Sequence, residues 1–137
     1  AASRVPMQDV CILLAEDTPT NQQGATVMLE RLGCQVTVVG DGDEALQALD
    51  RQRFDLVFMD CQMPEMDGFT ATRIIRRRHY LSRGGRHLPV IAMTAGVMVD
   101  DREACLASGM DDFLAKPFRQ AELEKMLRRW VVVTPQD

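Results

Sequence analysis

The chain has 137 residues, of which 46% are hydrophobic and 26% charged, and its formal net charge is −4 at pH 7. This composition excludes a disordered chain and is typical of one soluble globular domain with a core of its own. The negative charge gives no reason to expect nucleic-acid binding, and no apolar stretch approaches the roughly 20 residues that cross a bilayer. We therefore expect a domain that contacts neither nucleic acid nor membrane.

Ten segments of alternating type are predicted along the chain. In order they are strand Val10–Ala15, helix Thr20–Leu32, strand Gln35–Val39, helix Asp43–Arg51, strand Leu56–Met59, helix Phe69–Arg78, strand Val90–Met93, helix Val97–Ser108, strand Asp112–Ala115 and helix Gln120–Trp130. The strand segments are short and mix β-branched with other apolar residues, mostly without alternating polar side chains. This pattern is typical of strands buried on both faces, as in a parallel sheet. A glycine follows two of the helices, at Gly33 and Gly109, and is a helix stop signal.

Five repeats of strand and helix predict an α/β fold, with a five-stranded parallel sheet, right-handed crossovers and helices on both faces. We place the domain at residues 10–130, with residues 1–9 as a tail or cloning remnant and residues 131–137 as a second tail. In such folds a site lies outside the carboxyl ends of the strands, where the strand order reverses.

Polar and charged residues stand directly after four of the predicted strands. Glu16 and Asp17 follow the first strand, Asp60 the third, Thr94 the fourth and Lys116 the fifth. Each has an ordinary explanation when taken alone, because acids and threonines cap helices and lysines lie exposed in turns. Because the carboxyl ends of parallel strands meet at one edge, we expect these five side chains to share one crevice.

Three neighbouring carboxylates repel one another by about 4 kcal/mol for each pair at about 4 Å and an effective dielectric near 20. The sequence therefore predicts a bound cation, and a set of oxygen ligands favours Mg²⁺. The predicted ligands are the carboxylates of Glu16, Asp17 and Asp60 and the backbone carbonyl of Cys61.

Such an arrangement suits chemistry on phosphate, which requires positioning and charge neutralisation. Asp60 is the predicted nucleophile because it stands alone after the central strand, whereas the other two acids are adjacent. Lys116 is expected to pair with one phosphate oxygen, and the Thr94 hydroxyl to donate to another. Phosphorylation of Asp60 adds charge and acceptor oxygens, so Thr94 and its loop are expected to move towards it.

Other residues that carry chemistry have plainer explanations. The four cysteines form neither a C-x-x-C pair nor a zinc pattern, and we expect reduced thiols in a reducing cytoplasm. Asp41-Gly42-Asp43-Glu44 lacks the further acids of a calcium loop. The segment from Arg76 to His87 is basic and is interpreted as a solvated loop, with partner docking as the alternative.

Four motifs occur together: Glu16-Asp17, Met59-Asp60-Cys61-Gln62-Met63-Pro64-Glu65-Met66-Asp67-Gly68, Met93-Thr94-Ala95 and Lys116-Pro117. In order and spacing they resemble the response-regulator receiver family, from about Val10 to Trp130. The residues of these motifs are most similar to those of receivers attached to hybrid sensor histidine kinases. The resemblance implies a flavodoxin-like (βα)5 fold, dependence on Mg²⁺, and phosphorylation of Asp60 by a phosphohistidine.

The resemblance also implies roles for single residues. Thr94 takes the place of the switch hydroxyl and Lys116 that of the phosphate-binding lysine. Phe113 takes the place of a rotating aromatic residue that is more often tyrosine, and it has no hydroxyl. Gln62 and Gly96 occupy positions near the phosphate that tune its hydrolysis.

The implied partners are a histidine kinase domain and a histidine phosphotransfer domain. The expected location is the cytoplasm, including the cytoplasmic part of a membrane-anchored sensor kinase.

The expected function is a phosphoryl-accepting signalling module that catalyses its own phosphorylation and dephosphorylation. The alternative is an aspartate-nucleophile phosphohydrolase, which commonly needs a second acid where this chain has Gln62. A flavin- or nucleotide-binding module needs a phosphate-receptive loop after the first strand, where Glu16 and Asp17 repel phosphate. A degenerate receiver is disfavoured because every key position is filled.

Overall fold

The computed structural model describes residues 9–95 and 99–131, in which ten elements alternate. They are β1 Cys11–Ala15, α1 Pro19–Arg31, β2 Gln35–Val39, α2 Gly42–Arg51, β3 Leu56–Asp60, α3 Gly68–Arg77, β4 Val90–Thr94, α4 Val99–Ser108, β5 Asp112–Ala115 and α5 Gln120–Trp130. Every predicted element is present, and the described ends agree to within one residue, apart from the start of α4. The predicted start of that helix, Val97, lies outside the described residues.

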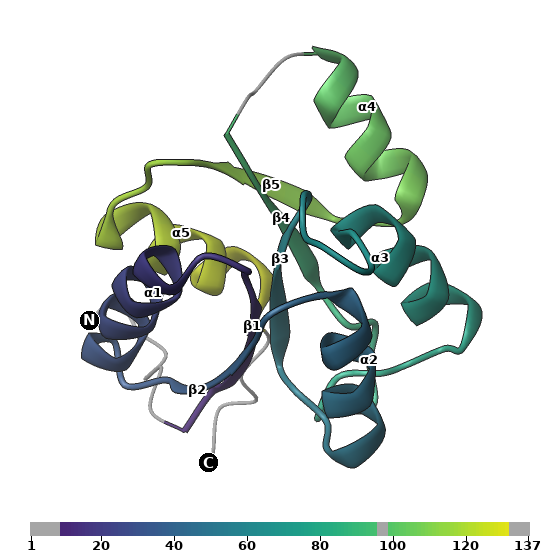
Figure 1. The fold of residues 1–137 in the computed structure, drawn as a ribbon. Helices are drawn as coiled ribbons and strands as arrows, with labels where there is room; N and C mark the ends of the chain where they lie inside the picture. Colours follow the sequence, from purple (N-terminus) through teal and green to yellow (C-terminus); the bar gives the residue numbers. More distant parts are fainter. Residues whose placement is uncertain (1–8, 96–98, 132–137) are drawn as a thin grey trace.

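All five strands belong to one parallel sheet with the order β2-β1-β3-β4-β5. Helices α1 and α5 cover one face of the sheet, and α2, α3 and α4 lie on the other side (Figure 1). The predicted fold class is therefore confirmed. The strand order reverses between β1 and β3, which is where folds of this kind form their crevice.

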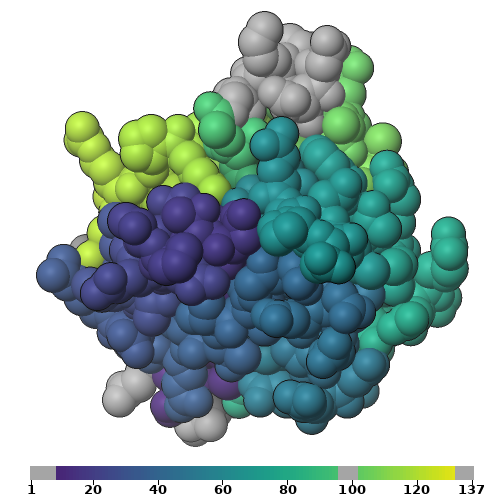
Figure 2. All heavy atoms as spheres, viewed as in Figure 1, coloured from purple at the N-terminus to yellow at the C-terminus, as the bar shows by residue number. Residues whose placement is uncertain are grey.

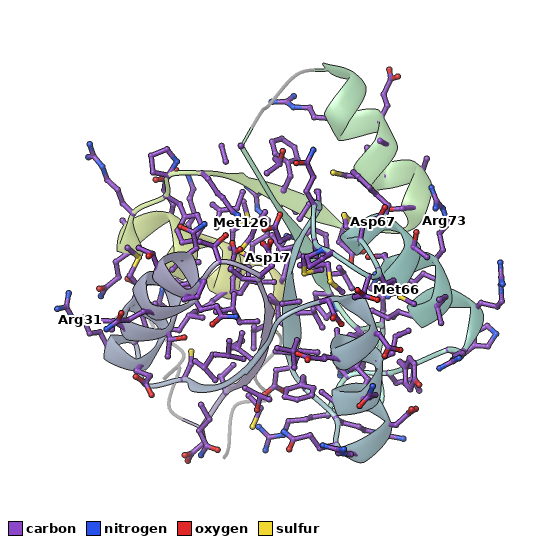
Figure 3. The ribbon with its side chains drawn as sticks, in the orientation of Figure 1. Asp17, Arg31, Met66, Asp67, Arg73 and Met126 are labelled. Atoms are coloured by element: carbon purple, nitrogen blue, oxygen red, sulfur yellow. The ribbon has the colours of Figure 1, made fainter. Side chains whose placement is uncertain are left out.

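The sheet divides the core into two apolar layers. Along β1, successive side chains point to opposite faces, so Leu13 joins the layer beneath α2, α3 and α4, while Ile12 and Leu14 join the layer beneath α1 and α5. Side chains fill both layers in Figure 3, whereas Arg31 at the end of α1 points outwards.

Burial on both faces was predicted for all the strands, and the prediction is wrong for β2 and β5. Strands β1, β3 and β4 are almost entirely buried, but Gln35 and Val38 of β2 are exposed, and Leu114 is the one buried residue of β5. The reason is topological, because β2 and β5 are edge strands with a single neighbour each.

The last described residue, which follows α5, is also packed. Val131, predicted as the first residue of a tail, is only 8% exposed and packs in the layer beneath α1 and α5. The packed unit therefore extends at least to this residue. No helix among the described residues is long and apolar enough to span a membrane.

Candidate functional site

The register of the parallel strands brings the predicted site residues to one edge of the sheet. Ala15 pairs with Met59, so that Glu16 comes level with Asp60. On β4, which lies beside β3, the last residue Thr94 pairs with Ala115 of β5. Lys116 follows Ala115, so it lies one residue beyond the level of Thr94. Asp60 and Thr94 were expected to follow their strands and instead form the last strand residues.

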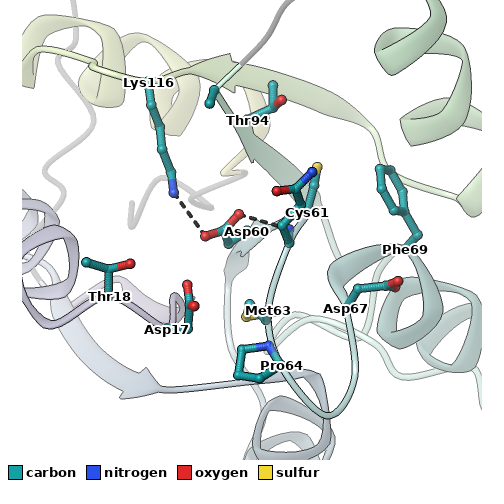
Figure 4. Close-up of a pocket in the computed structure, with 12 residues that line it drawn as sticks. Asp17, Thr18, Asp60, Cys61, Met63, Pro64, Asp67, Phe69, Thr94 and Lys116 are labelled. Carbon is teal, nitrogen blue, oxygen red and sulfur yellow. Dashed lines mark hydrogen bonds and ion pairs between the residues drawn. The ribbon is translucent and has the colours of Figure 1, made fainter.

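A cleft of ≈ 920 Å³ opens at this edge. Its lining residues come from the last residues of β3 and β4, from the connections after β1, β3, β4 and β5, and from the first turn of α3: Asp17, Thr18, Asp60, Cys61, Gln62, Met63, Pro64, Asp67, Phe69, Thr94, Ala95 and Lys116 (Figure 4). In the space-filling view, the start of α1 (purple) and the segment after β3 (teal) border each other on this face (Figure 2). Four of the five residues expected to share a crevice line this cleft, whereas Glu16 lines a neighbouring hollow.

Three carboxylates gather at this edge of the sheet. One oxygen from each of Glu16, Asp17 and Asp60 lies within 4.8 Å of the others. Glu16 is 1% exposed and Asp60 6% exposed, whereas Asp17 is exposed at the mouth. The two buried acids therefore need partners, because a lone buried carboxylate is strongly disfavoured.

Lys116 is the partner of both buried acids. Its Nζ donates to Glu16 Oε1 at 2.5 Å and to Asp60 Oδ2 at 2.9 Å, and the side chain extends towards Asp60 in Figure 4. Burial lowers the pKa of Lys116, but the hydrogen bonds and charges of Glu16 and Asp60 raise it by more, so it lies above its ordinary value of 10.5. The side chain is therefore a cation at neutral pH.

Backbone amides hold the remaining carboxylate oxygens. The Thr18 amide donates to Glu16 Oε2 at 3.0 Å, and the Gln62 amide donates to Asp60 Oδ1 at 3.1 Å. Both acids therefore have fixed orientations before any ligand arrives. The oxygens of three carboxylates form a hard donor set, which is the kind that Mg²⁺ prefers.

The Cys61 carbonyl, predicted as a further metal ligand, has a partner of its own. It accepts a hydrogen bond from the Gly68 amide at 3.1 Å. Gly68 is needed at this position because a Cβ there would lie 2.2 Å from the Asp60 carbonyl oxygen. A carbonyl has a second lone pair, so metal binding by Cys61 stays a prediction.

The structure does not bring every predicted residue into the cleft. Thr94 and Gln62 line it, but Phe113 does not. The Phe113 ring lies instead with its centroid 4.5 Å from the guanidinium carbon of Arg102. Gly96 lies outside the described residues.

Sequence reasoning assigned no site role to Phe69, which also lines the cleft. The available signal was the Asp67-Gly68 pair, which marks the start of α3. Asp67 caps that helix by accepting from the Thr70 amide at 2.7 Å, and the cap brings the first turn of α3 to the cleft wall.

The fold and the site together define an α/β domain whose sheet edge is suited to a cation and a phosphoryl group. The sequence-family model described as the response regulator receiver domain matches residues 12–128 of this chain. The chain belongs to this family, whose members are phosphoryl-accepting domains. Its predicted likeness to the receiver domains of hybrid sensor histidine kinases is confirmed.

Particular relatives are similar over most of the chain. The sensor histidine kinase GacS of Pseudomonas protegens is 40% identical over 129 residues, which are 94% of this chain and 14% of GacS. The receiver domain of sensor histidine kinase PA1611 from Pseudomonas aeruginosa PAO1, solved with magnesium coordinated in its active site cleft, is 48% identical with a TM-score of 0.79. The match covers 89% of this chain and 97% of that one.

A second similar structure is a complex of two proteins. In the co-crystal of the Saccharomyces cerevisiae histidine phosphotransfer protein Ypd1 with the receiver domain of Ssk1, the match has a TM-score of 0.82 and 26% identity, covering 91% of this chain and 90% of that one. The chain thus spans nearly the whole length of the PA1611 receiver domain but a small part of the length of GacS.

Proposed function

We propose that this domain accepts a phosphoryl group from a phosphohistidine onto Asp60 and passes it to a histidine phosphotransfer domain in a two-component phosphorelay. The observation that carries the proposal is the pairing of buried Asp60 with the Lys116 ammonium at 2.9 Å, beside two further acids. The proposed receiver unit covers residues 10–131, within the cytoplasmic part of a longer sensor kinase.

The acidic cluster fits Mg²⁺, since three carboxylate oxygens converge within 4.8 Å. Glu16, Asp17 and Asp60 would hold the ion, together with the Cys61 carbonyl. When bound, it neutralises charge on the phosphoryl oxygens. Support comes from PA1611, whose receiver domain was solved with magnesium in its cleft.

The residues of this chain perform the transfer by positioning. A carboxylate oxygen of Asp60 attacks phosphorus, the bond from phosphorus to the donor imidazole breaks, and its electron pair returns to the imidazole nitrogen. The Lys116 ammonium, anchored by Glu16, shifts its second hydrogen bond from Asp60 Oδ2 to a phosphoryl oxygen. The Thr94 hydroxyl donates to another phosphoryl oxygen.

Three further residues have proposed roles in switching and lifetime. Phe113 is proposed to change position when Thr94 moves towards the phosphoryl group. Gln62 and Gly96 are proposed to set how quickly water removes it. Gln62 lines the cleft, and its side chain is an amide rather than a carboxylic acid. This favours a phosphoacceptor over a phosphohydrolase, because fast hydrolysis of the phosphoryl intermediate needs a general acid or base.

A hollow of ≈ 360 Å³ beside the site is the proposed docking place for the phosphotransfer domain. It lies between α1 and the connection from β5 to α5, and Gly24, Met28 and Phe118 line it. Glu16 and Lys116 also border it, so a partner seated there lies beside the lysine that pairs with Asp60. The match to the Ssk1 receiver, crystallised with Ypd1, supports a phosphotransfer domain as the kind of partner. The donor kinase domain is proposed to approach the same edge.

Incubation with acetyl phosphate or beryllofluoride tests the proposal. With Mg²⁺ the wild type is expected to form one adduct, detected by intact mass or by fluorescence, and without Mg²⁺ none. Asp60→Asn should abolish the adduct, whereas Asp50→Asn, at an exposed acid on α2, should retain it. Catalytic release of phosphate with little adduct would identify a phosphohydrolase instead.

A further inference from the structure

Two buried thiols face each other across the layer beneath α2, α3 and α4. The Sγ atoms of Cys61 and Cys105 are 3.9 Å apart, although the residues are 44 positions apart in the chain. Cys61 directly follows Asp60, and Cys105 belongs to α4. We propose that these cysteines form a reversible disulfide under peroxide, a modification that ties the phosphoacceptor strand to α4.

The geometry requires only a small movement. A disulfide has an S–S length of about 2.05 Å, so the two sulfur atoms must approach by roughly 1.9 Å. Consecutive side chains of an extended segment point in opposite directions, so the Cys61 sulfur lies away from the Asp60 carboxylate, as in Figure 4. The pair therefore lies behind the cleft, in the apolar layer beneath α2, α3 and α4.

An oxidant is expected to reach the pair through Cys61. This residue lines the cleft and is 6% exposed, whereas Cys105, on α4, is 2% exposed and does not line the cleft. Hydrogen peroxide is small enough to enter such a site. Cys61 is therefore the thiol attacked first, and Cys105 is the resolving thiol.

The chemistry is balanced by one peroxide molecule. The Cys61 thiol gives up its proton, its sulfur attacks a peroxide oxygen, and the O–O bond breaks to release water and leave a sulfenic acid. The Cys105 sulfur then attacks the Cys61 sulfur, the S–O bond breaks, and a second water leaves. Two thiols and one peroxide thus become one disulfide and two waters.

The disulfide would act on Asp60 through the backbone. Cys61 and Asp60 share a peptide bond, and the next amide, that of Gln62, donates to Asp60 Oδ1 at 3.1 Å. Moving Cys61 towards α4 displaces both the carboxylate and this donor. A misplacement of about 1 Å costs up to about 100-fold in rate, so we expect oxidation to slow phosphoryl uptake about tenfold or more. This consequence rests on the proposed function, whereas the disulfide itself does not.

Another buried cysteine provides a matched control. Cys34 is 5% exposed, much as Cys61 is, but it does not line the cleft. We therefore expect Cys34 to remain reduced.

Mass spectrometry of the reduced full chain after hydrogen peroxide tests the site. The expected result is a loss of two hydrogen atoms, a proteolytic peptide pair linked through Cys61 and Cys105, and recovery with dithiothreitol. Cys105→Ala and Cys61→Ala should each prevent the link, and Cys34→Ala should leave it. An oxygen adduct on Cys61 alone, a link between two chains, or unchanged mass would each overturn the proposal. Peptide mapping of the oxidised wild type tests the disulfide even if a variant fails to fold.

Uptake from acetyl phosphate then tests the consequence. Oxidised wild type should form the adduct about tenfold more slowly than reduced wild type, with recovery after dithiothreitol. Equal rates in a chain shown to carry the disulfide would refute the effect on Asp60. Failure of the reduced chain to form any adduct would contradict the proposed function instead.

Discussion

Glu16 and Asp17 have the same charge and adjacent positions, yet they lie in different environments. Glu16 is buried and bonded to Lys116 at 2.5 Å, whereas Asp17 is exposed at the mouth of the cleft. Sequence reasoning identified both acids, Asp60 and Lys116, because each stands at the end of a predicted strand. It did not separate the two acids, because the turn of the chain after β1 decides which carboxylate faces inwards.

The substitution Asp17→Asn tests this difference between the two acids. In the absence of divalent ions, we expect the variant to be more stable by less than about 1 kcal/mol, since repulsion at an exposed position acts through solvent. Millimolar Mg²⁺ should raise the melting temperature of wild type but not of the variant, because a ligand stabilises only the state that binds it. Thermal denaturation with and without Mg²⁺ measures both effects.

Asp43→Asn, at an exposed acid in the first turn of α2, is the control and should keep the response to Mg²⁺. A full Mg²⁺ response in Asp17→Asn would show that this carboxylate is not a ligand.

Among the helices, α1 contains a glycine that the packing of the chain does not explain. A Cβ at Gly24 would meet no atom within 4 Å, in contrast to the close approach at Gly68. Glycine in a helix interior costs about 1 kcal/mol relative to alanine. The helical pattern predicted α1 despite this glycine, since its apolar positions still repeat at helical spacing, but no local pattern shows that Gly24 borders a hollow.

We expect Gly24→Ala to stabilise the domain by about 1 kcal/mol while slowing phosphoryl transfer to the phosphotransfer domain, since a methyl group narrows the proposed docking hollow. Chemical denaturation measures the first effect, and transfer of the phosphoryl group from Asp60 measures the second. Uptake from acetyl phosphate should be unchanged, because this small donor does not need the hollow.

Gln23→Ala, at the exposed neighbouring position of α1, is the matched control and should leave transfer unaffected. Transfer at the wild-type rate in Gly24→Ala would remove the argument that a partner occupies this surface.

For the molecule as a whole, the alternation of strands and helices was enough to predict the fold class and the edge that carries the site. It did not predict which strands are edges or that Val131 packs in the core, because both depend on pairing between distant segments. The contact between Cys61 and Cys105 has the same origin. Local sequence patterns predict where the helices and strands lie, whereas pairing between distant segments decides which of them are neighbours.

Global stability is expected to fall at high pH. The pKa of Cys34 is raised from 9.0 to about 11 by burial, Asp55 and Cys11. Above pH 9.0 the unfolded chain releases this proton while the folded chain keeps it, so unfolding becomes more favourable as the pH rises to about 11. Two pKa units correspond to about 2–3 kcal/mol.

Urea denaturation across this pH range measures the fall. Cys34→Ala should flatten it, whereas Cys11→Ala should keep most of it, since burial and Asp55 are the larger causes. An equally steep fall in Cys34→Ala would assign it to other groups, such as Lys116, whose pKa is also raised.

The bond between Lys116 and Glu16 joins residues 100 positions apart, and this separation has a consequence during synthesis. A nascent chain that has not yet emerged past β5 carries all three acids but lacks their internal counter-ion. A chain that ends before Lys116 cannot form this ion pair, so we expect it not to accept a phosphoryl group at Asp60.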